Sequence, residues 1–273
     1  MNRGLVLIIN SITLQLLRRI QKRDMRNCRL ITLFLLISFL GLMSSCARTT
    51  DPAPILDLEG NKIKQLEAGD IIVYGSYEQD GDKNNGPEPI EWEVLDVDDN
   101  RALLVSRYVL DCQPYNDYFG SITWKYCSLR KWLNSKFLKT AFTAEERVRI
   151  PTVVLSNPDN PVFGTDGGGN TRDRVFLLSV DEILEYYTFE EWNEDEHHGW
   201  WGYSQDLIIE ATPYAEDAGV FIKNGGSIMW TSSPSDSSFF VTVVDDKGCT
   251  GASKGLGTQD YFVGVRPAIY IDF

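Results

Sequence analysis

Residues 68–273 are predicted to form a single α+β domain of mainly antiparallel strands with two to four short helices. Three observations support this prediction. Strand-like runs occur near both ends of the range, apolar residues recur at helical spacing in its middle, and short turn-forming segments separate the runs. Strands at both ends with helices between them are typical of the α+β class. We expect the first and last strands to lie close together; an unrelated β-rich sandwich is the alternative.

The first part of the domain predicts an antiparallel meander of three strands. Residues 71–77 are rich in β-branched and aromatic side chains, and residues 90–97 alternate apolar with acidic ones, as a half-buried strand does. A turn at residues 99–100 leads into a third run at 102–108. Because short turns join these runs, neighbouring strands should pair antiparallel.

The segment between the first two strands partly matches a calcium-binding loop. Asp80, Asp82, Asn84 and Glu91 stand where such a loop carries ligands. The template requires glycine where Asn85 stands, and Glu91 belongs to the second predicted strand. We therefore favour a plain hairpin turn.

Helices are predicted in the middle of the domain, and strands return in its last third. Leu129, Trp132, Leu133 and Phe137 recur at helical spacing over residues 128–138. Three further helix starts carry caps: Thr143 with Glu146, Ser179 with Glu182, and Thr212 before Pro213. Further strands are expected at residues 174–178, 228–231, 238–244 and 262–271.

The N-terminal segment predicts export. Residues 25–45 have a basic start, an uncharged apolar run of 14 residues at 30–43, and small residues before Cys46. The run is shorter than the roughly 20 residues that a spanning helix needs, so it indicates a signal peptide. Residues 1–24 do not fit this scheme. We interpret them as a misassigned start or an extension, and a second targeting element is the alternative.

Residues 43–46, Met-Ser-Ser-Cys, resemble the lipobox of bacterial lipoproteins. The resemblance implies that the Cys46 thiol carries a diacylglycerol, which anchors the protein in a membrane. An ordinary cleaved signal with a coincidental cysteine is the alternative. Residues 46–67, with prolines and charges but no periodicity, are then expected to be a lipidated tether. The domain would face the periplasm or the cell exterior.

The charge of the chain disfavours nucleic-acid binding. The formal net charge is −13, from 26 basic and 39 acidic residues. Residues 1–46 contain seven of the basic residues and one of the acidic ones, so the rest of the chain has 19 and 38 and carries −19. Such a surface repels phosphate backbones. The negative charge is compatible with bound cations, with basic partners or with simple solubility.

Three cysteines remain in the domain: Cys112, Cys127 and Cys249. Outside the cytoplasm a cysteine pair can oxidise, so we expect a disulfide between Cys112 and Cys127, with Cys249 left over. A metal site needs more ligands at closer spacing than these three offer.

Several blocks of the domain carry a family resemblance. They are residues 69–80, 88–97, 110–116, 127–134, 156–160 and 264–268. In this order they resemble an uncharacterised domain family of secreted and surface proteins of anaerobic bacteria, over about residues 68–273. Through the Gly-Val-Arg-Pro ending at 264–267, that family resembles the C-type-lectin-like fold of formylglycine-generating enzymes. The resemblance implies a C-type-lectin-like fold but no activity, and Cys249 alone does not supply the cysteine pattern of those enzymes.

Two loops are candidate binding sites. Asp159, Asn160, Asp166 and Asp173 surround a run of three glycines and offer oxygen ligands for calcium; a solvated loop is the favoured alternative. Gly199-Trp200-Trp201-Gly202-Tyr203 is a flexible-looking segment whose rings could stack on a sugar or a partner chain. The alternative, also favoured, is that these rings plug the core beneath a loop.

The function expected from these observations is a non-catalytic binding module on a membrane-anchored, surface-exposed lipoprotein, with a glycan or a protein as ligand. No Ser–His–Asp or Cys–His arrangement can be identified, because His197 and His198 are the sole histidines. An exported enzyme and an envelope scaffold protein are the alternatives. No cofactor is predicted, although the acidic loop leaves calcium open.

Overall fold

The computed structural model describes residues 54–57, 60–63, 65–98, 100–195 and 199–273, without the side chains of residues 191–201. The predicted signal peptide, Cys46, the segment 1–24 and the histidine pair therefore lie outside the described residues. The chain divides into two units, Met1–Asp51 and Pro52–Phe273, of which the second contains the described residues. In the described part of the chain, we find no helix with the length and hydrophobicity needed to cross a membrane.

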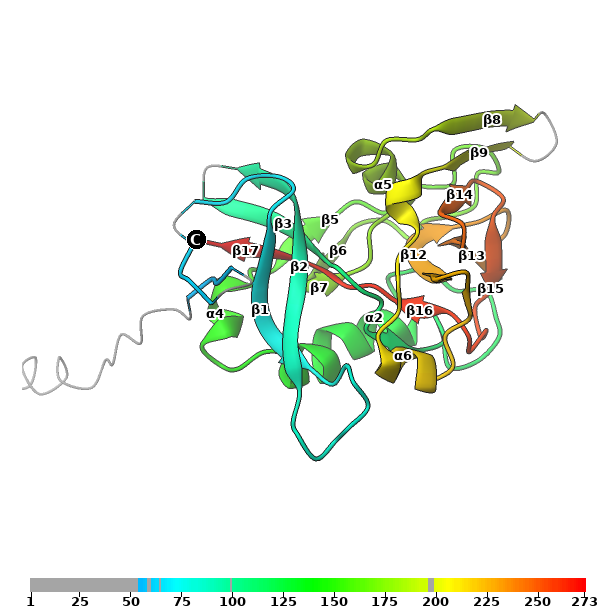
Figure 1. The fold of residues 1–273 in the computed structure, drawn as a ribbon. Coiled ribbons are helices and arrows are strands. Elements are labelled where there is room, and N and C mark those ends of the chain that lie inside the picture. Colours follow the sequence, from blue (N-terminus) through cyan, green and yellow to red (C-terminus); the bar gives the residue numbers. More distant parts are fainter. Residues whose placement is uncertain (1–53, 58–59, 64, 99, 196–198) are drawn as a thin grey trace, which may run out of the picture. The chain divides into compact units, whose positions relative to one another are not determined.

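A five-stranded antiparallel sheet contains both the first and the last strand of the second unit (Figure 1). Its order is β1 (Ile71–Tyr77), β2 (Glu88–Asp98), β3 (Arg101–Ser106), β17 (Ala268–Asp272) and β7 (Val175–Phe176). The first three strands form the predicted meander: a loop over residues 78–87 joins β1 to β2, and a short turn joins β2 to β3. The last strand pairs with β3, so two strands separate it from β1.

A second five-stranded sheet has the order β15 (Gly255–Gly257), β13 (Phe240–Val244), β12 (Met229–Pro234), β16 (Gly264–Val265) and β4 (Asp111–Cys112). Only β12 and β16 pair in parallel here. The chain passes between the two sheets from β3 to β4 and from β16 to β17. The class is therefore α+β with mostly antiparallel strands, as predicted.

The remaining strands form three small sheets. The pairs are β5 (Val153–Leu155) with β6 (Thr171–Asp173), and β10 (Ile222–Lys223) with β11 (Gly226–Ser227). A three-stranded sheet joins β8 (Glu191–Asp195), β9 (Gly199–Tyr203) and β14 (Cys249–Gly251). Residues 199–203 are thus a paired strand and not the flexible loop that we expected. Aromatic residues favour strands, and glycine content alone misled the prediction.

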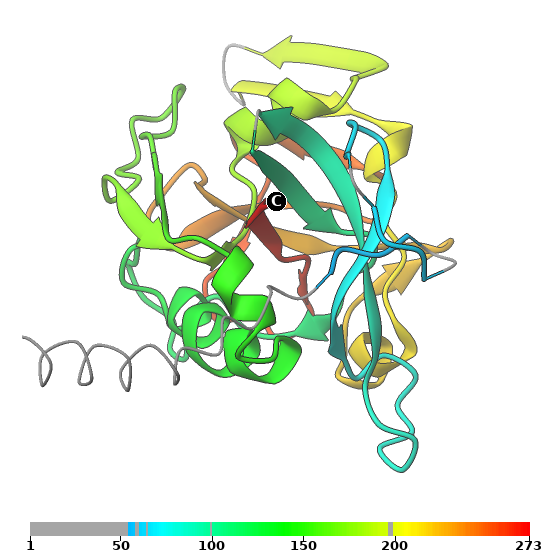
Figure 2. The same ribbon diagram turned by 90° about the vertical axis from the view of Figure 1, so that its left-hand side faces the viewer.

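The helical segments follow the predicted caps. They are α2 (Ser128–Trp132), η1 (Leu133–Phe137) and α3 (Leu138–Ala141) in one continuous run, then α4 (Glu146–Arg149), α5 (Val180–Tyr186), η2 (Gln205–Leu207) and α6 (Pro213–Asp217). Figure 2 shows the continuous run beside the first sheet, where α3 contacts β1 and η1 contacts β7. The Ser179–Glu182 capping box and the Thr212 cap before Pro213 are confirmed.

The folded part of the chain begins before the end of the predicted tether, residues 46–67. Ile55 and Leu66 are buried in the hydrophobic core, although both fall within residues 46–67. Leu56 pairs with Val73 of β1, and the Val73 N–H donates to the Leu56 carbonyl at 2.8 Å. Residues 54–57 and 60–63 are therefore part of the folded unit, because they cover apolar surface at the edge of the first sheet.

The predicted disulfide is wrong: Cys112 and Cys127 are free thiols. Cys127 caps α2, since its Sγ accepts the N–H of Arg130 at 3.4 Å and donates to the carbonyl of Trp124 at 3.3 Å. The Cys112 thiol donates instead to the carbonyl of Tyr261 at 2.8 Å. Burial raises the pKa of each thiol to about 12. Each thiol thus has a separate hydrogen-bond partner, and the spacing of the two cysteines in the sequence could not reveal these partners.

Candidate functional site

A groove of about 630 Å³ lies between the β1–β2 hairpin, the segment around residues 56–60 and the residues just before α6. This volume is within the usual range for ligand sites. Part of its lining is apolar: Leu56, Val73, Pro89, Tyr108, Ala211 and Pro213. Such a lining can bury the hydrocarbon part of a ligand.

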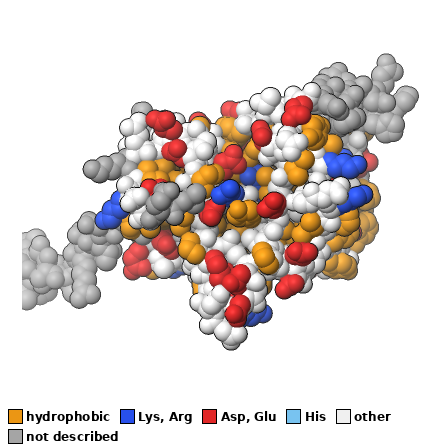
Figure 3. Space-filling view, viewed as in Figure 1, with side chains coloured by type: hydrophobic (Ala, Val, Ile, Leu, Met, Phe, Trp, Pro, Cys, Tyr) orange, Lys and Arg blue, Asp and Glu red, His pale blue; other side chains and the backbone are white. Residues whose placement is uncertain are grey.

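The polar lining of the groove is strongly acidic. Five carboxylates contribute to it: Asp57, Asp80, Glu88, Glu91 and Glu210. Neither lysine nor arginine is found among the described residues that line the groove. Figure 3 shows acidic side chains gathered over the adjoining hairpin loop. The groove therefore combines an apolar surface with negative charge.

Arg107 stands beside the groove. The Arg107 Nη1 lies 2.6 Å from Glu91 Oε2, and the guanidinium lies 5.4 Å from the ring centre of Tyr108. The pair is partly exposed, so it fixes the position of Glu91 more than it stabilises the fold. The other four carboxylates still give the groove a net negative charge.

Backbone hydrogen bonds hold the walls of the groove together. The N–H of Thr212 donates to the carbonyl of Val109 at 3.0 Å, and the N–H of Val109 donates to the carbonyl of Glu210 at 3.0 Å. The N–H of Tyr214 donates to the carbonyl of Gln79 at 2.9 Å. These bonds join the start of α6 to the segment after β3 and to the segment after β1. The walls of the groove are thus held together by backbone hydrogen bonds.

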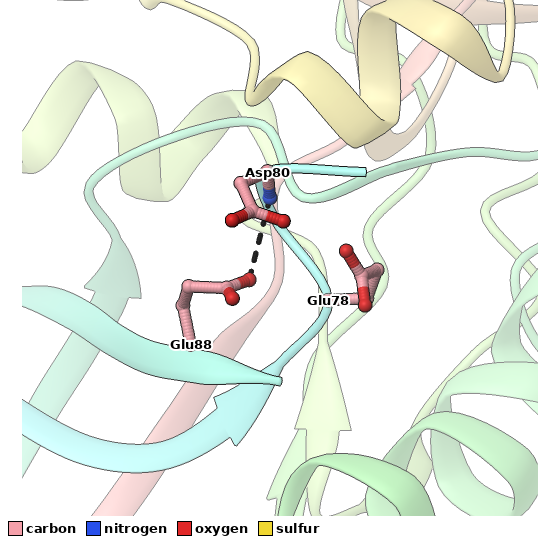
Figure 4. Close-up of side chains that lie close together, drawn as sticks. All are labelled: Glu78, Asp80 and Glu88. Carbon is pink, nitrogen blue, oxygen red and sulfur yellow. Dashed lines mark hydrogen bonds between the residues drawn. The ribbon is translucent and has the colours of Figure 1, made fainter. Parts of the chain in front are cut away.

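Glu78, Asp80 and Glu88 form a carboxylate cluster at one end of the groove (Figure 4). One oxygen of each lies within 4.8 Å of the others. The Gln79 N–H donates to Glu88 Oε2 at 2.7 Å, and the Asp82 N–H donates to Asp80 Oδ1 at 2.7 Å. These carboxylates therefore accept hydrogen bonds from the backbone of the hairpin loop, and the predicted hairpin between the first two strands is present.

The surroundings of the cluster shift the pKa values of Glu78 and Asp80. Partial loss of hydration raises the pKa of Glu78, and the like charges of Glu88 and Asp80 add to this effect. The backbone N–H of Asp82 and the amide of Asn85 lower the pKa of Asp80. Asp80 consequently stays ionised down to lower pH than an ordinary aspartate, which preserves negative charge in the groove.

The four predicted calcium ligands are not gathered into one ligand set. Asp159 Oδ1 accepts the N–H of Gly167 at 3.0 Å, and Asp166 Oδ1 accepts the N–H of Gly168 at 2.7 Å. The Asn160 amide donates to the carbonyls of Pro234 in β12 and of Ala252 just after β14. Asp173 is buried against Arg130 at 2.7 Å. Each side chain has a separate structural partner, and calcium binding at this loop remains an untested prediction.

Of the three predicted stacking aromatics, only Tyr203 has a described side chain. It is half-buried in β9, and its hydroxyl donates to Gln205 Oε1 at 2.7 Å. The side chains of Trp200 and Trp201 lie outside the described residues. The groove, by contrast, was not predicted, because its walls come from four segments that are distant in sequence.

The blocks that carried the family resemblance have structural roles. Arg266 is buried, and its guanidinium donates to the Ser106 carbonyl at 2.7 Å, to the Tyr187 hydroxyl at 3.1 Å and to Glu93 Oε2 at 3.1 Å. Asn134 Oδ1 accepts the N–H of Arg174 at 2.8 Å. These bonds join segments far apart in the chain. These residues of the blocks therefore stabilise the fold, and they do not indicate a ligand.

Comparison with known proteins identifies a family without an assigned activity. A family model described as a domain of unknown function (DUF6273) matches residues 99–273. The match begins after β2, so the blocks at 69–80 and 88–97 lie outside it, as do two walls of the groove, the β1–β2 hairpin and the segment around residues 56–60. No curated protein and no solved structure matches the chain. Since the match covers more than half of its length, the chain belongs to the DUF6273 family.

Proposed function

We propose that the chain is a membrane-anchored lipoprotein whose domain is a non-catalytic binding module. Its groove would take a cationic ligand with an apolar part, such as a peptide segment that carries lysine or arginine. The observation that supports this proposal is the combination of five carboxylates and an apolar lining in one groove without a lining cation among its described residues. The lipid at Cys46 would hold the module at a membrane.

The chemistry of lysine and arginine suits such a groove. Their hydrocarbon stems can cover apolar surface while the charged ends reach the rim. Each methylene removed from water contributes about 0.8 kcal/mol. A charge pair at 4 Å contributes about 1 kcal/mol in bulk water and about 4 kcal/mol near a protein surface. A short basic and apolar segment would therefore gain from both parts of the lining.

The resemblance to the C-type-lectin-like fold stays part of the proposal. Two features support it: the first and last strands share one sheet, and the Gly-Val-Arg-Pro ending leads directly into the last strand. Binding modules without catalytic residues occur on many folds, so the ligand is inferred from the groove and not from the fold.

The test uses the full chain in detergent with two short synthetic peptides, one alternating lysine with leucine and one alternating glutamate with leucine. We expect the lysine peptide to bind and the glutamate peptide not to bind, measured by fluorescence anisotropy. Raising the salt from about 0.05 M to about 0.5 M should weaken binding, since it screens charges at the rim. Equal binding of the two peptides would contradict the proposal.

A further inference from the structure

Seven exposed aromatic side chains lie on four loops at the second sheet; one of them, Phe240, is the first residue of β13. We name them the aromatic end: Tyr118, Phe119, Phe221, Phe239, Phe240, Tyr261 and Phe262. They are 39% to 66% exposed. Figure 3 shows hydrophobic side chains gathered at the right-hand edge of this face, where Figure 1 places β15. None of the seven lines the acidic groove.

Hydrogen bonds join the four loops to one another. The N–H of Thr258 donates to the carbonyl of Phe239 at 3.1 Å, and the Gln259 side chain donates to the carbonyl of Asp117 at 3.0 Å. The N–H of Phe221 donates to the carbonyl of Phe262 at 2.8 Å. The loops therefore present their rings from one connected framework.

The rings also contact one another across the loops. The ring centres of Phe119 and Phe239 lie 5.6 Å apart, within the range of a direct aromatic contact. These two residues come from loops more than a hundred positions apart in the sequence. Their contact leaves both side chains about half exposed, so the pair presents a joint apolar surface to the outside.

The exposed area of the aromatic end is large. An aromatic side chain buries about 150–250 Å² when it is fully covered, so seven of them at half exposure present roughly 700 Å². The largest apolar patch on a typical monomer is about 300–600 Å². One side of a standard protein–protein interface is about 800 Å². The aromatic end thus has the size of one partner's half of an interface.

The charges around the rings indicate what kind of partner fits. Residues 116–122, 219–221, 236–240 and 257–262 contain three aspartates, Asp117, Asp236 and Asp260. The three positions on either side of these ranges add Glu216 and Asp217 but also Lys125, Lys223 and Lys254, which leaves a net charge of −2. Like charges disfavour a second copy of this chain or an anionic lipid surface, and opposite charges favour a basic partner. Five of the seven rings are phenylalanine, which offers no hydrogen bond to a sugar hydroxyl.

We propose that the aromatic end is a docking surface for a second protein whose contacting face is apolar at its centre and rimmed with lysine or arginine. This surface is separate from the groove, so the two can be occupied at the same time. The two rings that contact each other, Phe119 and Phe239, would be the main anchors, because a few clustered aromatic residues carry most of the energy of an interface.

The first test is photo-crosslinking of the full chain in its native cells, with p-benzoylphenylalanine at Phe119 or, as a control, at Val148. Val148 is 72% exposed on α4 and does not belong to the aromatic end. We expect a discrete protein adduct at position 119 that is absent at 148. Adducts to the chain itself or to lipid alone, or no adduct beyond the control, would overturn the proposal.

The second test measures the affinity of the crosslinked protein, once purified, for the full chain. The double variant Phe119→Ser, Phe239→Ser should weaken binding at least about 30-fold, as expected for anchor residues. Val148→Ser should leave it unchanged. Circular dichroism of both variants should match the wild type, since these side chains are exposed. Unchanged affinity in the double variant, or a partner whose contacting face is acidic, would refute the docking surface.

Discussion

Replacing Arg130 by methionine would leave a buried carboxylate without its guanidinium partner. The Arg130 Nε lies 2.7 Å from Asp173 Oδ1, and the Asp173 side chain is fully buried while that of Arg130 is 20% exposed. The remaining donors to Asp173 are neutral: Thr171 Oγ1 at 2.7 Å and Trp124 Nε1 at 3.2 Å. Breaking a buried pair in this way costs about 3–5 kcal/mol of unfolding free energy.

The converse substitution should cost less. Asp173→Asn removes the buried charge and leaves the partly exposed guanidinium of Arg130 open to hydration, so we expect a loss of about 1–3 kcal/mol. A matched surface pair provides the control. Arg101 and Asp272 also lie 2.7 Å apart, but their side chains are 43% and 47% exposed. Arg101→Met should therefore cost less than about 1 kcal/mol.

The assay is urea unfolding of the unit Pro52–Phe273, which has its own hydrophobic core. Tryptophan fluorescence monitors the unfolding. The expected order of destabilisation is Arg130→Met, then Asp173→Asn, then Arg101→Met. The reasoning is refuted if Arg130→Met costs no more than Arg101→Met. It is also refuted if Asp173→Asn costs more than Arg130→Met, because the buried charge would then not dominate.

Three further predictions follow from burial and from the N-terminal sequence. Burial raises the pKa of Asp111 above its ordinary 3.8. As pH rises from 4 towards 8, the wild type should therefore lose stability relative to Asp111→Asn. Urea midpoints measure this difference, and the opposite trend would contradict the prediction. The thiols of Cys112 and Cys127, whose pKa values burial raises to about 12, should react with a thiol reagent only after unfolding, and a disulfide found by peptide mapping would overturn the assignment. Cys46→Ser should move the protein from the membrane to the soluble fraction after a carbonate wash, and retention would reject the lipid anchor.

Local signals in the sequence were reliable guides to the fold. The Ser179–Glu182 capping box depends on residues three positions apart, and the structure contains both of its hydrogen bonds. The meander of β1, β2 and β3 was equally predictable, because side-chain alternation marks its strands and strands that follow one another in the sequence commonly pair. The resemblance to an uncharacterised family was confirmed in that the chain belongs to a family of unknown function, although the matched range begins at residue 99 and not at residue 68.

Long-range features could not be read from the sequence. The pairing of Arg130 with Asp173 crosses 43 positions, and no local pattern marks it. Cys112 and Cys127 lie at a plausible spacing for a disulfide, yet spacing does not tell where each sulfur points. The β8–β9 hairpin was missed because glycines flank its aromatic residues. The groove was missed for the same reason as the ion pair, since the fold alone brings its walls together.

The groove is tested most directly by the affinity of the lysine–leucine peptide for the full chain and for two single variants. Glu210 is exposed and lines the groove, whereas Glu145 is exposed at the start of α4 and does not line it. We predict that Glu210→Gln weakens binding about 3- to 10-fold, which corresponds to about 0.7–1.4 kcal/mol for the loss of one nearby charge. Glu145→Gln should leave the affinity unchanged. Equal affinities of the wild type and Glu210→Gln, or equal weakening by both variants, would contradict a cation-binding groove.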